Sequence, residues 1–378
     1  DVRRVLEESP DPFTPASWEK RCALAHFEPK GALISRGLER DERRRFNEDV
    51  LEHHCPMHTL AAHFAAIVAQ EAHQLLAEID RTDGVMTWEM FKAAWFRAVR
   101  QAVFGSEARD DTELIDMIEK LRSAGNFAFL HPTRTHLRDR FHDRVRQHLE
   151  RAEPGSLAEV MARTPQNDHT APEQQVPQWL FAFDPAAMTT FRALALLSTH
   201  TEQQERAREE IRSHEPATQP LPFLRATILE SLRLWPTTPL VLRESTRDTR
   251  WEAGIMPAGT GIIIYAPFFH RDTARLDEAD RFAPEIWEGE DPAADHWPLI
   301  PFSAGPAICP GRHMVLLMTS AMLANLLRDR DVSMVDPQRV DPNKPMPGIL
   351  NNYTLRFRIS ARPSPQGSRT PMQEGEPA

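Results

Sequence analysis

Cysteine is scarce in this chain of 378 residues, which has only Cys22, Cys55 and Cys309. Three cysteines cannot form the disulfide framework on which small secreted domains depend, so we expect a protein of a reducing compartment, the cytoplasm. The chain also lacks the ~18 consecutive apolar residues of a membrane helix. Charged residues and a proline interrupt its most apolar stretch, residues 179–197. No signal peptide is visible, although the start at Asp1 leads us to expect a preceding segment.

A surplus of positive charge is absent as well. Lysine and arginine number 45 against 55 aspartates and glutamates, which gives a formal net charge of −10. This balance excludes non-specific nucleic-acid binding, which needs clustered cations to neutralise phosphates. The 41% of hydrophobic residues and 26% of charged residues are ordinary for a soluble globular protein, and the length suffices for one large enzyme domain.

Helical periodicity dominates the first two-thirds of the chain. Apolar residues at spacings of three and four predict helices over residues 57–80 and 87–105. Short β-type runs bounded by proline and glycine predict a small sheet in the last third. We expect a mainly α fold with a minor β region. Its helical core covers about residues 38–235 and 310–328, its β-rich part covers about 236–309 and 331–360, and residues 363–378 form a disordered tail.

Cys309 lies in a turn-rich segment directly before Pro310, Gly311 and a predicted helix. A cysteine at a helix start is close to backbone N–H groups and the positive end of the helix dipole, which lower a thiol's pKa. A thiolate in such a place can ligate a metal, haem iron included. The alternative is that this cysteine is a small buried hydrophobic residue.

The surrounding pattern, Phe302-x-x-Gly305-x-x-x-Cys309-x-Gly311, resembles the haem-ligating loop of the cytochrome P-450 family. The resemblance implies that Cys309 binds the iron of haem b and that Phe302, Gly305 and Gly311 shape its loop. Ala307 stands where the family has arginine or histidine, so we expect weaker haem retention than in relatives.

The family's second signature, Glu-x-x-Arg on a helix, is matched by Glu230 and Arg233. Residues three apart share a helix face and can pair, but the same spacing recurs elsewhere in the chain. What distinguishes this pair is the segment that follows it and leads to Arg243, which the resemblance places at a haem propionate. Arg281 is predicted as the third member of the Glu–Arg cluster, with a structural role.

The third signature lies on the predicted helix over residues 178–197. Thr190 fills the position of the family's oxygen-positioning threonine, while Thr189 replaces its acid and Ala187 its glycine. The resemblance therefore implies that oxygen binds beneath Ala186–Thr190 and that Thr189 and Thr190 take part in catalysis. The alternative is a core helix in which both hydroxyls bond to the helix's own carbonyls.

Arginines near the N-terminus match a further family motif. Arg40-x-x-x-Arg44 is similar to the family's His/Trp-x-x-x-Arg helix, which implies that Arg44 contacts a propionate. Arg43 and Arg45 are rivals for this role, and a solvated charged face is the alternative reading.

The resemblance covers residues 1 to about 362 and implies a cytochrome P-450 fold that lacks the family's N-terminal helix and strands. The implied activity is that of a soluble, bacterial-type haem-thiolate monooxygenase acting on a hydrophobic organic substrate with O₂. Without a flavin or iron–sulfur motif, electrons would come from a ferredoxin and its reductase, or a similar donor, docked near Arg312 and residues 40–45. No membrane partner is expected. The predicted substrate pocket contains Phe181, Ala186, Thr238, Leu240, Val241 and Leu350.

Two alternatives to monooxygenase activity stay open at this point. The missing acid at Thr189 is compatible with peroxide-driven or non-oxygenating haem chemistry on the same fold. A non-catalytic helical binding protein, in which Cys309 is merely buried, is the other.

Overall fold

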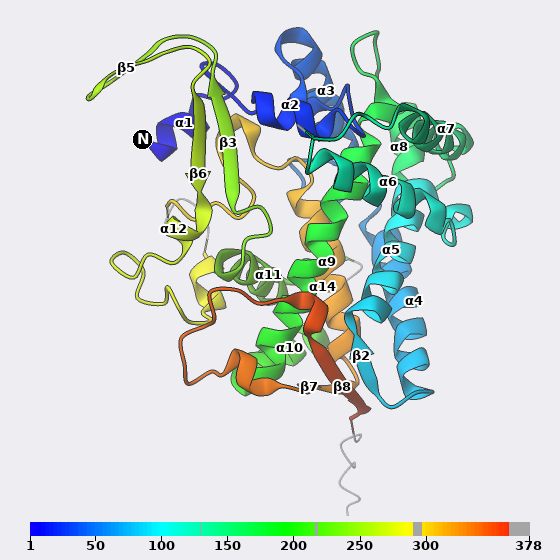
Figure 1. Ribbon diagram of the computed structural model, residues 1–378. Helices are drawn as coiled ribbons and strands as arrows, with labels where there is room; N and C mark the ends of the chain where they lie inside the picture. Colours follow the sequence, from blue (N-terminus) through cyan, green and yellow to red (C-terminus); the bar gives the residue numbers. More distant parts are fainter. Residues whose placement is uncertain (129, 216–217, 290–296, 363–378) are drawn as a thin grey trace, which may run out of the picture.

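The computed structural model describes residues 1–128, 130–215, 218–289 and 297–362. Within these residues the fold is mainly helical with three small antiparallel sheets, which confirms the mainly α fold with a minor β region (Figure 1). The tail expected from residue 363 lies outside the described residues. The helices are α1 (Val2–Glu7), α2 (Trp18–Leu24), α3 (Gly37–Val50), α4 (Ala61–Asp80), α5 (Trp88–Phe104), α6 (Thr112–Gly125), α7 (Thr135–Arg151), α8 (Leu157–Arg163), α9 (Val176–Thr199), α10 (Thr201–Ser213), α11 (Pro222–Leu234), α12 (Ala266–His270) and α14 (Arg312–Leu327).

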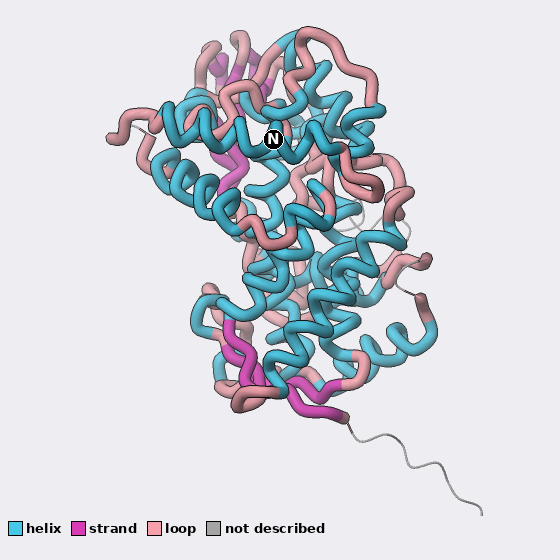
Figure 2. Tube along the Cα trace, turned by 90° about the vertical axis from the view of Figure 1, so that its right-hand side faces the viewer, coloured by secondary structure: helices cyan, strands magenta, loops and turns pink. Residues whose placement is uncertain are grey.

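The strands form two three-stranded sheets and one hairpin. The first sheet has the order β1-β3-β6, the second β2-β8-β7, and β4 pairs with β5. The first two sheets lie at opposite ends of the molecule (Figures 1 and 2). The strands are β1 (Phe13–Thr14), β2 (Val85–Thr87), β3 (Leu240–Ser245), β4 (Thr249–Trp251), β5 (Gly254–Met256), β6 (Gly261–Tyr265), β7 (Arg330–Met334) and β8 (Arg356–Ala361).

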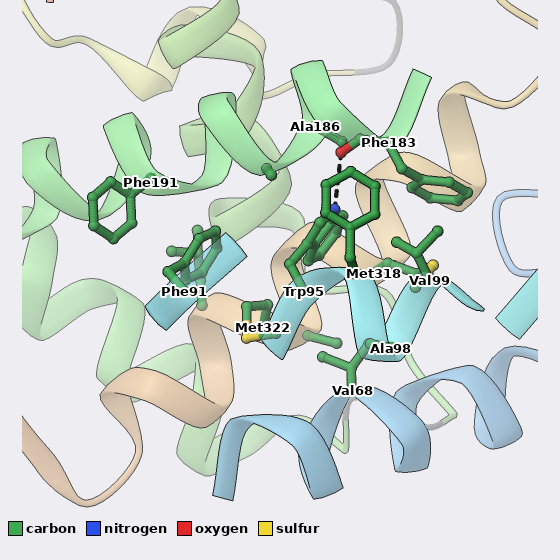
Figure 3. Packing of buried hydrophobic residues seen from close by; sticks show 14 of the residues in the cluster. Val68, Phe91, Trp95, Ala98, Val99, Phe183, Ala186, Phe191, Met318 and Met322 are labelled. Carbon is green, nitrogen blue, oxygen red and sulfur yellow. Dashed lines mark hydrogen bonds between the residues drawn. The ribbon is translucent and has the colours of Figure 1, made fainter. Parts of the chain in front are cut away.

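Helices α9 and α14 run side by side through the centre of the molecule (Figure 1). Nearly every residue of α14 after Val315 is buried, as expected for a helix that is apolar on all sides. Side chains from α4, α5, α9 and α14 interlock in one cluster, in which the indole N–H of Trp95 donates to the carbonyl oxygen of Phe183 at 2.8 Å (Figure 3). This core holds α9, which carries Thr189 and Thr190, and α14, which follows Cys309.

One helix of the described residues, Pro172–Thr199, is long and apolar enough to cross a membrane. Of its most apolar window, 72% is buried inside the protein, as expected for the core helix of a globular protein.

The ends of several elements differ from the sequence-based expectation. Helix α4 begins at Ala61 rather than at residue 57, because residues 51–60 form turns. The last strand, β8, begins at Arg356 rather than at residue 353. The side chain of Asn351 accepts a hydrogen bond from the amide of Tyr353 and so holds the preceding residues in a 3₁₀ turn.

Candidate functional site

Cys309 lies between a 3₁₀ turn, η5 (Gly305–Ala307), and the start of α14. Its amide donates to the carbonyl oxygen of Phe302 at 2.9 Å, which closes the loop. Gly305 has a φ of +65°, and a Cβ atom there would lie 2.1 Å from the carbonyl oxygen of Leu6. Only glycine fits such a position, so the structure gives a physical reason for the second residue of the motif.

Burial raises the pKa of the Cys309 thiol above its ordinary value. The amide of Gly311 and the guanidinium groups of Arg44 and Arg312 act in the opposite direction but do not outweigh it. The expectation of a lowered thiol pKa is therefore wrong for the protein without a metal. Desolvation destabilises the thiolate by more than the nearby amide and guanidinium groups stabilise it. A metal deprotonates its thiol ligand outright, so the raised pKa is compatible with ligation.

Glu230 and Arg233 form a fully buried ion pair on α11, with contacts of 2.6 and 2.7 Å. The carboxylate of Glu230 also accepts hydrogen bonds from the amide of Ala283 and the indole of Trp287, both at 2.9 Å. The guanidinium of Arg233 donates to four backbone carbonyls, those of His270, Glu278, Ala279 and Arg281.

The prediction that the Arg281 side chain completes this cluster is wrong. Arg281 contributes only its carbonyl oxygen, at 2.8 Å from Arg233, and the residue itself is exposed. A second guanidinium would add a positive charge to an ion pair that is already neutral, whereas carbonyl oxygens satisfy the remaining N–H groups without adding charge. The cluster therefore fixes the segment around residues 270–287 to α11.

Both threonines on α9 bond to their own helix. The hydroxyl of Thr189 donates to the carbonyl of Pro185 at 2.9 Å, and that of Thr190 donates to the carbonyl of Ala186 at 2.8 Å. Ala187 is fully buried beside them. These are the bonds of the alternative reading, and the catalytic role of the two hydroxyls stays a prediction.

Asp184, the one acid in α9, is bound to another helix and not to these threonines. It pairs with Arg122 of α6 at 2.5 Å. Both residues line a cavity of about 10 Å³ that also borders Phe181. A cavity of this size holds about one water molecule, so it is not a pocket for an organic substrate.

The residues predicted to line a substrate pocket differ in their burial. Ala186 and Leu350 are buried, Phe181 and Val241 are partly buried, and Thr238 and Leu240 are exposed. Leu350 is held by its carbonyl, which accepts a hydrogen bond from Arg192 of α9 at 2.9 Å. That these six residues line one substrate pocket stays a prediction.

The arginines of α3 are mostly paired with acids. Arg44 pairs with Glu48 at 2.5 Å and donates to the carbonyl of Ile308 at 2.7 Å, beside Cys309. Arg45 pairs with Glu42 and with Asp49. The expected cationic face formed by residues 40–45 is therefore largely neutralised.

Arg40 differs from its neighbours, because it is buried and its acidic partner is the exposed Asp41, 3.5 Å away. Burial and Arg44 lower its pKa. Burial and the charge of Arg40 likewise lower the pKa of Arg243 to about 10. Arg243 donates to Ser9, Ser303 and its own strand, and no acid pairs with it among the described residues.

Lys20 of α2 is a third cation near Arg243, in addition to Arg40. The sequence did not predict it. It is partly buried, and its ammonium donates to the carbonyl of Leu242 at 3.3 Å. Burial and the charge of Arg243 lower its pKa to about 7. No motif marks Lys20, because only the folded chain brings α2 to β3.

These residues fit the haem b that the sequence resemblance implies. A partly buried cysteine just before α14 is a suitable iron ligand, and its loop is closed by the Phe302 carbonyl. Buried cations without acidic partners are costly unless an anion offsets them, and haem b carries two carboxylates. Arg243, which pairs with no acid among the described residues, and Arg40, whose partner Asp41 is exposed, would be the residues to bind these groups, whereas Arg44 is paired with Glu48 at 2.5 Å.

Comparison with known proteins agrees with this assignment. A 2-hydroxyisoflavanone synthase of Glycine max is 31% identical over 41% of this chain and 33% of its own length. Cytochrome P450 4c3 of Drosophila melanogaster is 34% identical over 38% of this chain and 29% of its own. Methyltetrahydroprotoberberine 14-monooxygenase of Papaver somniferum is 30% identical over 48% and 37%. The matched part of the chain spans about a third of the length of these relatives.

The fold is similar to that of a solved structure, retinoic acid-bound cyanobacterial CYP120A1. The match has a TM-score of 0.75 at 16% identity and covers 95% of this chain and 87% of the other. A family model described as Cytochrome P450 matches residues 168–356, which is half of the chain and includes Thr190, the Glu230–Arg233 pair and Cys309. The chain belongs to the cytochrome P450 family.

Proposed function

We propose that this protein is a haem-thiolate monooxygenase that inserts one oxygen atom of O₂ into a hydrophobic organic substrate. The observation that carries the proposal is the combination of a partly buried cysteine in a glycine-dependent loop with the buried Arg243, which pairs with no acid among the described residues. Haem b bound through a thiolate supplies an iron at which O₂ is bound and its O–O bond cleaved.

Separate groups of residues would bind the haem and hold the fold around it. Cys309 would hold the iron, and Arg243 and Arg40 would hold the propionates. Glu230 and Arg233 would keep the segment beneath the site in place, since their hydrogen bonds all end within α11 and residues 270–287.

Thr190 would act from the other side of the site. Its hydroxyl donates to the carbonyl of Ala186, which leaves the oxygen free to accept a further hydrogen bond. A hydroxyl held in this way would be suited to fix a water molecule and to pass on a proton.

Electrons would come from a separate ferredoxin-type donor. Arg312 lies at the start of α14, three residues after Cys309, and contacts the imidazole of His53 at 2.8 Å. No carboxylate pairs with Arg312 among the described residues, so its charge is available to an acidic partner. We place the protein in the cytoplasm, which its free cysteines support, and the soluble bacterial type stays a prediction.

A second candidate is peroxide-driven chemistry on the same haem. It is favoured by Thr189, whose hydroxyl is bonded to the carbonyl of Pro185 at the position where the family has an acid. Without that acid, proton supply to O₂ would be slow, whereas hydrogen peroxide brings its own protons.

The absorption spectrum of the purified protein tests the proposal. We expect a Soret band in the ferric form and the strongly red-shifted band of a thiolate–CO complex after reduction under carbon monoxide. The variant Cys309→Ala should lose the shifted band. A Soret band typical of imidazole ligation would contradict the assignment of Cys309, and a spectrum without haem would contradict the proposal altogether. Product formation with hydrogen peroxide but none with O₂ and reductant would favour the second candidate.

A further inference from the structure

Three cations from separate elements meet near the first sheet. Lys20 comes from α2, Arg40 from α3 and Arg243 from β3. Lys20 donates to the carbonyl of Leu242, next to Arg243 in β3, and the charge of Arg243 lowers the pKa of Lys20. Arg40 in turn lowers the pKa of Arg243, so Arg243 is repelled from both sides. The one carboxylate in ion-pair contact with them, among the described residues, is that of Asp41, which is 65% exposed.

Such an arrangement is unfavourable in the protein alone. The two buried arginines and the partly buried lysine lose hydration, and like charges nearby add repulsion. Among the described residues Lys20 has one hydrogen-bond acceptor, the carbonyl of Leu242, for its three N–H groups. An apolar side chain of the same length would remove both costs.

We propose that Lys20 binds a propionate of haem b and completes, with Arg40 and Arg243, the set of cations that offsets the two haem carboxylates. Three cations against the one carboxylate of Asp41 leave two positive charges, and the two propionates bring two negative charges. Lys20 thereby supplies the charge that Ala307 does not provide. This inference rests on the proposed haem-binding function.

The test measures haem retention rather than turnover. Transfer of haem to excess apomyoglobin is followed by absorbance for the wild type, Lys20→Met and Lys20→Arg. Loss of a charged hydrogen bond should speed haem loss about tenfold in Lys20→Met, while Lys20→Arg stays within about twofold of the wild type. Lys30→Met is the matched control, since Lys30 is exposed in the following loop, and its rate should not change.

Thermal unfolding of the apoproteins separates haem binding from packing. Removal of a repelled cation should leave the Tm of Lys20→Met apoprotein equal to that of the wild type, or raise it. A packing role predicts the reverse: a lowered apoprotein Tm together with equal haem loss in Lys20→Met and Lys20→Arg.

Either that result or unchanged haem loss in Lys20→Met would overturn the inference while leaving the proposed function intact. A wild type that binds no haem would overturn the proposed function, and this inference with it.

Discussion

The carboxylate of Glu230 and the guanidinium of Arg233 face each other through two hydrogen bonds, and neither side chain reaches solvent. The further side-chain hydrogen bonds of the pair go to the last residue of α12, His270, and to the segment that follows it. We expect Glu230→Gln to lower the free energy of unfolding by about 3–5 kcal/mol, because it leaves a buried guanidinium without its counter-charge. Denaturant unfolding of the apoprotein measures this change.

The control for that variant is Asp143→Asn. Asp143 pairs with Arg146 at the same i,i+3 spacing and at 2.8 Å, but both side chains are more than half exposed. Exposed pairs contribute about 0–1 kcal/mol, so this variant should hardly change stability. Equal losses of unfolding free energy in Glu230→Gln and Asp143→Asn would show that burial does not determine how much the ion pair contributes to stability.

Gly305 and Gly311 flank Cys309 and should respond differently to alanine. Gly305→Ala places a Cβ against the backbone of Leu6 at a positive φ, and we expect a loss of about 2–4 kcal/mol in unfolding free energy. Gly311 has a φ of −94°, and a Cβ there meets only a methyl of Leu51 at 3.5 Å. Gly311→Ala should therefore cost less than about 1 kcal/mol in the apoprotein. A larger loss of unfolding free energy in Gly311→Ala than in Gly305→Ala would show that the loop is not held by α1.

His270 makes the fold sensitive to acid. Burial, followed by the charge of Arg233, lowers its pKa to about 4, and its Nε2 accepts a hydrogen bond from the amide of Ile300. Because the unfolded chain takes up this proton near pH 6.5 and the folded chain only near pH 4, stability falls as pH decreases between these values. From pH 7 to pH 5 this residue alone should account for about 2 kcal/mol of the loss.

Chemical unfolding at the two pH values checks this prediction. In His270→Gln the difference in unfolding free energy between pH 7 and pH 5 should be about 2 kcal/mol smaller than in the wild type. The control is His136→Gln, at an exposed position, which should keep the wild-type difference. An unchanged difference in His270→Gln would mean that the imidazole is protonated in the folded state.

Ala307→Arg introduces the cation that the sequence resemblance implies for the position two residues before the cysteine. Position 307 is partly exposed, so a longer side chain has access to solvent. We expect slower haem transfer to apomyoglobin, and a larger slowing in the Lys20→Met background, where one balancing charge is missing. If the variant loses haem as fast as the wild type in both backgrounds, position 307 does not control retention.

Arg312→Glu tests the docking of the electron donor. Reversal of this charge should slow reduction by an acidic ferredoxin, and the effect should shrink as salt is added. Arg358→Glu makes the same change in net charge on β8, which pairs with the strand that follows the far end of α14 (Figure 1). A rate that falls equally in both variants would indicate a general effect of net charge.

The sequence predicted the parts of the site that depend on local patterns. Cys309 with its glycines, and Glu230 with Arg233, lie in short motifs that fix their relative positions. The third partner was predicted wrongly as the Arg281 side chain, because hydrogen bonds to backbone carbonyls leave no trace in residue identity. Lys20 meets the carbonyl of Leu242, 222 residues later, and no local pattern encodes such a contact. The start of β8 was misplaced for a related reason, since the turn held by the Asn351 side chain overrides hydrophobic periodicity.

The backbone contact between Leu6 and Gly305 has a consequence for the order in which the protein forms during its synthesis. Helix α1 leaves the ribosome early, whereas the glycine it covers follows about 300 residues later. At ribosomal rates of 5–20 residues per second, roughly 15 to 60 s separate the two. Throughout that interval Val5 and Leu6 have only Phe13 of the buried residues in their cluster, because Ile264 and Ile300 follow much later. The cysteine loop cannot pack against α1 until residue 305 has been made.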